Sequence, residues 1–352
     1  MATLGEYPFI RFHDPTNQRT SLSAKLAKLL QNELDELCKV DSDFPPKSPF
    51  PPGTLIILDR GYDPIAPLLH EFTYQAMAND LLNFEGGSKY VYGYAEEDGS
   101  TVNKSVILDD NDSLWVQYRH TFIAEVTTGL VDQLNRFMSE NKAAVASTGM
   151  KEGKPDLQQL KETLHALPEF QQAKAKFSTH INLAQECMKI FNKKRLMDVG
   201  NVEQCLATGE TPDGTEPKNI VVDMMPLLTD PNLPSSDKVR LLMLYIISKQ
   251  GIQDEDRRKF LDRAGLSLDE SQSITNLSML GVRLSKAEGV KKEKKPSKPR
   301  KKNKDGDVPY DLSRYIPQVK HLMEVYSLRK SFFFFIFKTF YCLLMIDLSH
   351  CI

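Results

Sequence analysis

The segment Thr54–Leu82, TLIILDRGYDPIAPLLHEFTYQAMANDLL, is the most informative part of this chain about its fold. It opens with the apolar run Leu55–Leu58, which is too short for a helix and typical of a strand buried on both faces. Asp59-Arg60-Gly61 ends the strand, and Asp63-Pro64 has the residue types of a helix start, with Asp as N-cap. Apolar residues then recur at helical spacing from Leu68 to Leu82. The stretch therefore predicts a strand, a charged elbow and a long amphipathic helix.

Five charged or titratable side chains follow the predicted strand at this elbow: Asp59, Arg60, Asp63, His70 and Glu71. Carboxylates at such a position can bind a metal or attack a phosphate, so an α/β hydrolase or phosphotransferase using Asp59 and Asp63 is one hypothesis. The simpler interpretation is structural, because an ion pair between Asp59 and Arg60 would fix the elbow without any substrate. No phosphate loop, GxGxxG, zinc spacing or nucleophile motif accompanies these residues, so we expect no catalytic residue, metal or cofactor.

The composition is that of an ordinary globular protein. Of the 352 residues, 41% are hydrophobic and 26% are charged, and the net charge of −2 gives no overall attraction to nucleic acid or anionic membrane. The five cysteines are scattered without CxxC spacing, which favours reduced thiols. The N-terminus MATLGEYPF lacks the order of a secretory signal, so we expect a cytoplasmic location.

Periodicity and turn residues predict short strands early in the chain and helices later. Pro168 separates two helices that we expect to face each other as a hairpin. Strands are expected at residues 8–12, 90–94 and 105–108, helices at 22–37, 114–134, 157–167, 170–191, 254–264 and 268–280, and a central helix, apolar on nearly all sides, at Val239–Ile247.

The segment Lys291–Lys304, KKEKKPSKPRKKNK, has a different character. Nine basic residues without a large apolar side chain cannot support a core, which favours a disordered surface loop. A nuclear adaptor is the alternative, but no aromatic residue is interleaved to stack on bases, so we expect no nucleic-acid partner. The charges suit weak contact with anionic lipid.

The Phe-rich tail, residues 327–352, also differs in composition from the rest of the chain. Its apolar run Phe332–Ile346 is interrupted by Lys338 and is shorter than the about 20 residues that a membrane span needs. We interpret it as an alternative-exon or gene-model end rather than as an anchor.

The stretch from Thr54 to Leu82 also resembles the signature of the SM family, the Sec/Munc-type, syntaxin-binding regulators of SNARE assembly. The resemblance extends from Ala2 to about Tyr326. Its matching positions include Leu58-Asp59-Arg60, Asp63-Pro64, Pro67-Leu68-Leu69-His70-Glu71, Thr73-Tyr74-Gln75-Ala76-Met77, Asp80-Leu81-Leu82, Leu114-Trp115, Arg119-His120, Leu167-Pro168, Ser178-Thr179-His180, Val202-Glu203-Gln204 and Leu312-Ser313-Arg314.

The resemblance implies an α/β plus mainly α protein, in which a partial parallel α/β sheet domain is followed by a large helix-rich arched domain. Residues 1–70 would form the first part of the family's α/β second domain. Residues 71–284 would form its helix-rich third domain, with a SNARE-facing hairpin at about 155–192. Segment 285–309 would be a basic disordered loop, and 310–326 a family-like helix. The family's first domain and the closing part of its second would lie outside this chain, which we therefore expect to be a fragment with an incomplete sheet.

The resemblance further implies a non-enzymatic regulator of vesicle docking and fusion, most similar to the clamps of exocytosis. The implied partners are syntaxin-type SNAREs and vesicle SNARE helices, and the implied location is peripheral to the plasma membrane or vesicles. The family's hinge proline falls on Pro168, where a switch between a folded loop and an extended helix is expected. The expected partner-binding residues are Pro168, Gln171, Lys174, Ile181 and Gln185.

Overall fold

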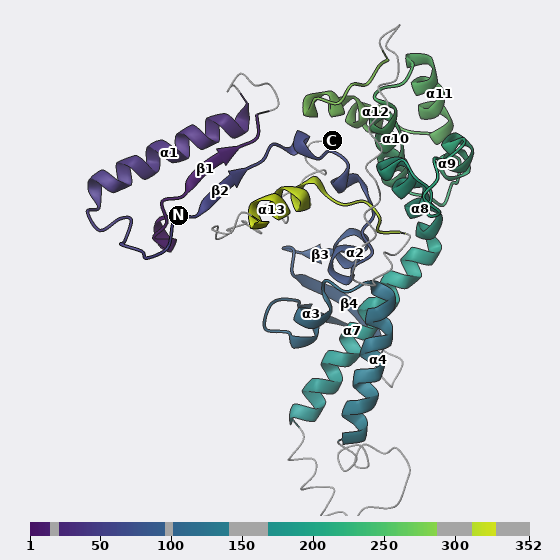
Figure 1. Cartoon of the computed structure of the whole chain (residues 1–352). Coiled ribbons are helices and arrows are strands. Elements are labelled where there is room, and N and C mark those ends of the chain that lie inside the picture. The colour runs from purple at the N-terminus through teal and green to yellow at the C-terminus, as the bar shows by residue number, and fades with distance from the viewer. Residues whose placement is uncertain (15–20, 96–100, 141–167, 287–311, 329–352) are drawn as a thin grey trace, which may run out of the picture. The chain divides into compact units, whose positions relative to one another are not determined.

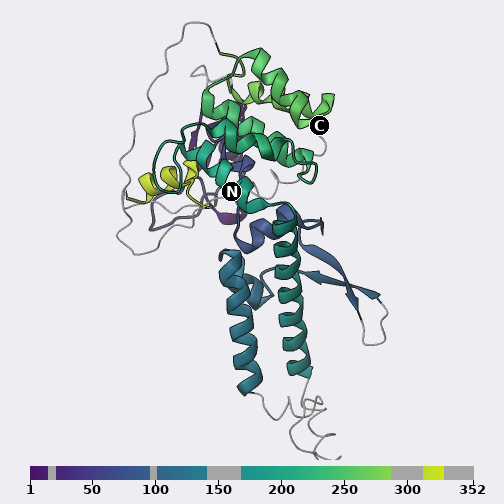
Figure 2. The ribbon, with the colours of Figure 1, turned by 90° about the vertical axis from the view of Figure 1, so that its right-hand side faces the viewer.

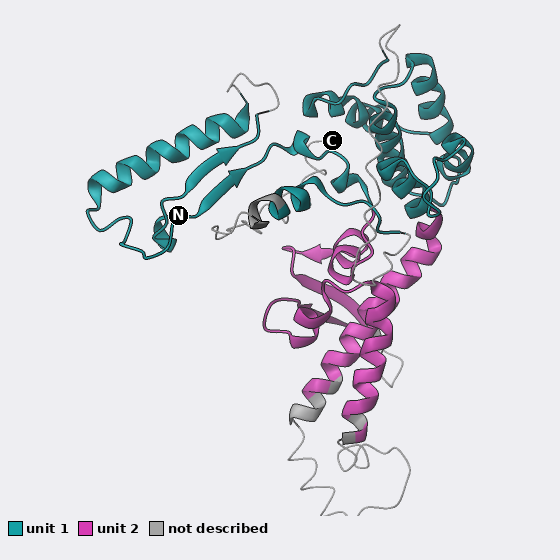
Figure 3. Ribbon diagram, viewed as in Figure 1, with its two compact units in different colours: residues 1–69, 199–352 teal, residues 70–198 magenta. Residues whose placement is uncertain are grey.

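The computed structural model describes residues 1–14, 21–95, 101–140, 168–286 and 312–328. These residues form two compact units, and Figure 3 shows them in different colours. Unit 1 comprises residues 1–69 and 199–352, and unit 2 comprises residues 70–198. The expected domain of residues 71–284 stays a prediction, and the compact units divide that range between 198 and 199.

Unit 1 begins with a small α/β element. Strands β1 (Phe9–Phe12) and β2 (Thr54–Ile57) pair in parallel, and helix α1 (Leu22–Val40) connects them and packs on β1 (Figure 1). Ser21 caps α1 by accepting a hydrogen bond from the Ala24 N–H. The strand predicted at the start of the segment Thr54–Leu82 is confirmed as β2. The prediction that it is buried on both faces is wrong, because the sheet has two strands in the described residues and Leu55–Ile57 are only half-buried.

The predicted start of the next helix, at Leu68, is also wrong. The chain after β2 forms two 3₁₀ turns, η2 (Arg60–Tyr62) and η3 (Ala66–Leu68), and helix α2 spans only Tyr74–Leu81. Leu69 is extended, with ψ of 141°, and Thr73 forms a β-bridge with Phe122. This backbone pairing competes with helix formation, so the helix begins only at the residue after Thr73.

The rest of unit 1 is helical. Its most buried helix is α10, in which Leu241, Leu242, Leu244 and Ile246 are at most 2% exposed, so the predicted central helix is confirmed. Pro317 precedes α13, which explains why, among the described residues 312–326 of the predicted helix 310–326, the helix begins only at Gln318. The helices are α8 (Leu196–Thr208, whose first three residues belong to unit 2), α9 (Ile220–Leu228), α10 (Ser235–Lys249), α11 (Asp254–Ala264), α12 (Leu268–Thr275) with the 3₁₀ turn η4 (Asn276–Leu280), and α13 (Gln318–Leu328).

Unit 2 packs a small antiparallel sheet against helices. Its strands, in the order β3-β4-β5, are Phe84–Glu85, Lys89–Ala95 and Thr101–Ile107. Its helices are α2, α3 (Ser113–Tyr118), α4 (Ile123–Glu140) and α7 (Pro168–Lys193). The two long helices α4 and α7 lie side by side (Figure 2).

The apolar stripe at 114–134, expected as one helix, forms the two helices α3 and α4. The chain breaks between them because residues 121–123 bond to the start of α2: the Tyr74 N–H donates to the Thr121 carbonyl, and the Ile123 N–H to the Phe72 carbonyl, at 2.9 Å each. These bonds replace the helical bonds that a continuous helix would make.

Several predictions concern residues outside the described ones. They are the helix at 157–167, the basic segment Lys291–Lys304 and the tail beyond residue 328. Among the helices of the described residues, none is long and apolar enough to cross a membrane.

Candidate functional site

Asp63 is the centre of the elbow in unit 1. Its side chain is buried, at 2% exposed, and accepts four hydrogen bonds. Two come from the Ile65 and Ala66 N–H groups, at 3.2 and 3.0 Å, and fix the turn that leads into η3. The other two come from the Tyr315 hydroxyl and the Gln318 N–H, both at 2.9 Å. One carboxylate therefore joins segments 252 and 255 positions apart.

The ion pair expected between Asp59 and Arg60 does not form in the described residues. Asp59 accepts a hydrogen bond from the Gly61 N–H at 2.8 Å and caps η2, while the Arg60 guanidinium donates to the Asp63 carbonyl. Asp59 and Arg60 each bond to a backbone group instead of to each other, as is usual at tight turns. A Cβ on Gly61 would lie 2.7 Å from the Leu280 carbonyl oxygen, so glycine is needed where the elbow meets η4.

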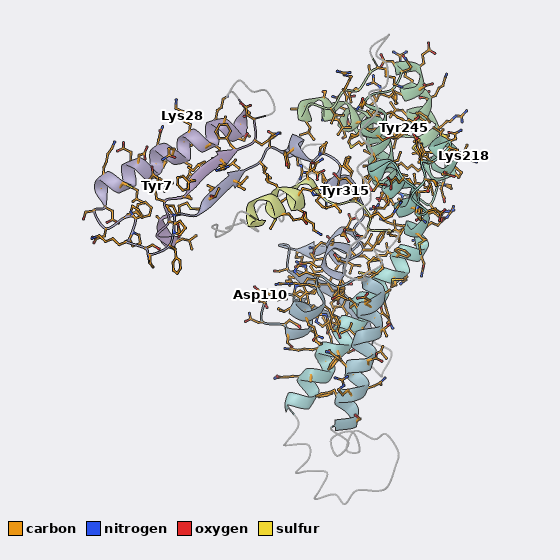
Figure 4. All side chains as sticks on the ribbon, in the orientation of Figure 1. Tyr7, Lys28, Asp110, Lys218, Tyr245 and Tyr315 are labelled. Carbon is orange, nitrogen blue, oxygen red and sulfur yellow. The ribbon has the colours of Figure 1, made fainter. Side chains whose placement is uncertain are left out.

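The segment before α13 is held by a second buried side chain. The Gln204 side-chain oxygen accepts hydrogen bonds from the Arg314 and Tyr315 N–H groups, at 2.9 and 2.8 Å. Figure 4 labels Tyr315 where the chain enters α13. Burial, and then the bond to Asp63, raise the pKa of Tyr315 above its ordinary range, so its hydroxyl remains a donor. Val202–Gln204 and Leu312–Arg314 are both positions of the family resemblance, but no sequence pattern predicts this role of Gln204.

His70 and Glu71 belong to unit 2, whereas Asp59, Arg60 and Asp63 belong to unit 1. His70 is 4% exposed, with its Nε2 3.8 Å from the Asp80 carboxylate, and Glu71 accepts a hydrogen bond from the Phe72 N–H at 3.1 Å. In the part of the chain that the structure describes, no group of three or more His, Cys, Asp or Glu side chains could hold a metal ion. The structural role expected for the acidic residues of the elbow stays a prediction, and the hydrogen bonds of Asp59 and Asp63 to backbone N–H groups are consistent with it.

The inner face of α7 carries a polar cluster at the centre of unit 2. His180, which is 0% exposed, lies between Tyr74 of α2 and Asp112, the N-cap of α3. Its Nδ1 is 2.9 Å from the Tyr74 hydroxyl, and its Nε2 is 3.2 Å from an Asp112 oxygen, at ion-pair distance but without hydrogen-bond geometry. The Trp115 ring stacks near His180, with 6.4 Å between the centroids.

The charges of this cluster are set by burial and by one another. Burial lowers the pKa of His180 below its ordinary value, and the Asp112 carboxylate acts against that shift. Burial also acts to raise the pKa of Asp112, but the Trp115 N–H and His180 outweigh it and keep that pKa low. At neutral pH the cluster therefore holds a neutral imidazole beside a carboxylate.

The outer face of α7 is polar and only partly covered. Ser178, Gln185 and Lys189 are exposed, and Ile181 and Asn182 are half-buried. Positions three and four apart share a helix face, so this face points away from the buried His180 side. The expected partner-binding residues Ile181 and Gln185 thus lie about one turn apart on the helix. Pro168 is the first residue of α7, and the side chains of Pro168, Gln171 and Lys174 are outside the described ones.

The chain matches the model of the Sec1 family over residues 1–332. It is 39% identical to "Protein transport protein sec1" of Dictyostelium discoideum over 92% of this chain and 52% of that protein. It is 29% identical to the "SNARE-interacting protein KEULE" of Arabidopsis thaliana over 93% of this chain and 50% of that protein. The chain therefore spans about half the length of the curated relatives it matches.

Solved structures show the same fold. The Unc18 protein in the "Unc18-syntaxin 1 complex from Monosiga brevicollis" matches with a TM-score of 0.72 and 27% identity, over 92% of this chain and 55% of that one. The "SM Protein Vps45 in Complex with Qa SNARE Tlg2" matches with a TM-score of 0.71 over 94% of this chain and 56% of that one. At 20% identity, the second likeness concerns the fold alone.

Proposed function

This chain belongs to the Sec1 family, and we propose that it is a non-enzymatic regulator of SNARE assembly in vesicle docking and exocytosis. The observation that carries the proposal is the family match over residues 1–332, which includes all of unit 2 and most of unit 1. The names of several relatives refer to protein transport, and the solved Unc18 protein is in complex with syntaxin 1.

We infer that the partners are a syntaxin-type SNARE and, at the same surface, a vesicle SNARE helix. The outer face of α7 supports this inference. Ser178, Gln185 and Lys189 offer hydrogen-bond groups, while Ile181 adds a half-buried apolar side chain at the edge of that face. An amphipathic helix can bury one apolar stripe beside such polar groups without leaving charges unpaired. Pro168, Gln171 and Lys174 extend the proposed surface toward the start of α7.

An enzymatic function lacks support from the elbow. The Asp63 carboxylate is buried and accepts four hydrogen bonds from the protein itself, three at Oδ1 and one at Oδ2, and Asp59 caps η2. A hydrolase or phosphotransferase would need one of these groups free to meet substrate.

We place the protein in the cytoplasm, peripheral to the plasma membrane or to vesicles, with weak anionic-lipid contact through Lys291–Lys304.

A pull-down with purified SNAREs tests the proposal. The chain, shown to be folded by its helical circular dichroism, is incubated with immobilised syntaxin-type and vesicle SNAREs. We expect retention of the chain on one or both. A folded chain that is retained on neither would refute the proposed function, while turnover of a phosphate ester would support the enzyme hypothesis instead.

Replacing Pro168 with alanine should favour an extended form of α7. Proline suits the first turn of a helix but cannot donate the hydrogen bond that a longer helix needs at that position, a cost of about 3 kcal/mol in a helix interior. We therefore expect Pro168→Ala to increase helical circular dichroism and to change SNARE affinity.

A matched control is Pro234→Ala, since Pro234 is the N-cap of α10 in unit 1. This variant should leave SNARE affinity unchanged. Unchanged helicity together with unchanged SNARE binding in Pro168→Ala would show that Pro168 is not a hinge.

A further inference from the structure

Helix α7 is fixed to the centre of unit 2 by one buried polar cluster on three elements. The Tyr74 hydroxyl of α2 reaches His180 Nδ1 at 2.9 Å and also lies 3.3 Å from the His180 carbonyl oxygen. Asp112 approaches the other ring nitrogen at 3.2 Å. Tyr74 and His180 are both 0% exposed, so water cannot replace these partners when they are lost.

The proton positions follow from the partners. We assign the proton of the neutral ring to Nε2, because the Asp112 carboxylate 3.2 Å away favours an N–H there even without hydrogen-bond geometry; Nδ1 then accepts from the Tyr74 hydroxyl. The other Asp112 oxygen is occupied by the Leu114 and Trp115 N–H groups, at 3.0 Å each, which fix the carboxylate at the start of α3. A proton added to Nδ1 would remove the acceptor that Tyr74 uses.

We propose that His180 is a positioning residue that docks α7 onto α2 and α3 in its neutral state and loosens the helix when it is protonated. This docking sets the place of the outer face of α7, so its consequence for partner binding rests on the proposed function. The bonds themselves do not depend on any partner.

The groups that face His180 account for the sign of the effect. On α3, Asp112 favours the charged ring; on α7, Lys176 disfavours it. On α2, Tyr74 stays protonated, because burial raises its pKa well above the ordinary value, with smaller contributions from Cys187, Asp112 and Tyr90. Burial also raises the pKa of the Cys187 thiol to about 12, so the thiol is neutral. Burial outweighs the single facing carboxylate, and the pKa of His180 is lowered.

The pH window follows from the lowered pKa. Below the ordinary value of 6.5 the unfolded chain binds a proton at this position while the folded chain does not, so stability is lost as the pH falls below that value. Asp112 has a lowered pKa as well, so its stabilisation is present above its ordinary value of 3.8 and is lost only as the pH falls further. His180 therefore controls the mildly acidic range.

Hydrogen exchange of the full chain tests the proposal. We expect the protection factors of the amides around His180 in α7 to fall by up to about tenfold between about pH 7.5 and about pH 5.5. In His180→Asn, which keeps a neutral partner for Tyr74, protection should be lower near pH 7.5 but no longer depend on pH. The control His321→Asn removes an exposed histidine of α13 and should behave as the unchanged chain.

Tyr74→Phe gives a second measurement if His180→Asn fails to fold. It removes the hydroxyl that donates to Nδ1 of the neutral ring, so the protection of α7 should be lower near pH 7.5 and its fall on acidification should become smaller. Protection in the unchanged chain that does not vary with pH, or a pH dependence that persists in His180→Asn, would overturn the proposal.

SNARE pull-downs at the same two pH values separate this proposal from the proposed function. Exchange that follows His180 without any SNARE retention would contradict the function alone. Retention without a His180-dependent exchange profile would contradict the positioning role alone.

Discussion

Asp63→Ala is expected to lower the free energy of unfolding of unit 1 by about 3–5 kcal/mol, the effect typical of removing one side of a buried, charge-assisted network. The substitution leaves four donors without their acceptor: the Ile65, Ala66 and Gln318 N–H groups and the Tyr315 hydroxyl. The elbow and the segment leading into α13 are held by the same carboxylate, so both should loosen together.

Urea denaturation followed by circular dichroism measures this loss. Asp256→Ala is the matched control, because Asp256 lies in the same unit with a side chain 57% exposed, in an ion pair of 4.0 Å with Lys259. It should cost less than about 1 kcal/mol. Tyr315→Phe should fall between the two, at about 1 kcal/mol, since it removes one donor. An Asp63→Ala chain as stable as the Asp256→Ala chain would show that the network does not hold unit 1.

A double substitution on the outer face of α7, Ile181→Asp with Gln185→Asp, is expected to weaken SNARE binding by at least tenfold, or about 1.4 kcal/mol. The two carboxylates would have to be desolvated against a partner helix, which costs more than the contacts that they replace. Titration of the labelled chain with a purified syntaxin-type SNARE measures the change in affinity.

Two controls separate a lost surface from a lost fold. Gln185→Asp alone changes an exposed position and should leave the melting temperature unchanged while weakening binding in part. Val222→Asp places the same charge at a 63% exposed position of α9 in unit 1 and should bind SNAREs normally. Equal loss of affinity in Val222→Asp and in the double variant would exclude a specific role for α7.

Local patterns predicted the elements of this fold well where a single segment determines its own structure. Apolar runs or periodicity predict the parallel strand β2, the strands β4 and β5, and the central helix α10. The start of α2 did not, because the bonds between residues 72–74 and 121–123 are made by segments distant in the sequence. The same bonds divide the stripe at 114–134 into α3 and α4.

The candidate site shows the same limit. The residues of the elbow predict a structural role but not the partner of Arg60, since the nearest charge in sequence, Asp59, bonds to the backbone instead. Asp63 was expected to cap a helix, and it does bond to the next N–H groups. Its bonds to Tyr315 and Gln318 arise 252 and 255 positions away. His180 carried no signal beyond a family match, because burial and its two partners appear only in the folded unit.

We propose that a syntaxin-type SNARE binds the outer face of α7. Isothermal titration of the full chain with a purified syntaxin-type SNARE tests it most directly. We expect saturable binding that is lost in the Ile181→Asp, Gln185→Asp double variant and kept in Val222→Asp. A chain with intact helical circular dichroism that gives no binding signal, or a double variant that binds as tightly as the unchanged chain, would contradict it.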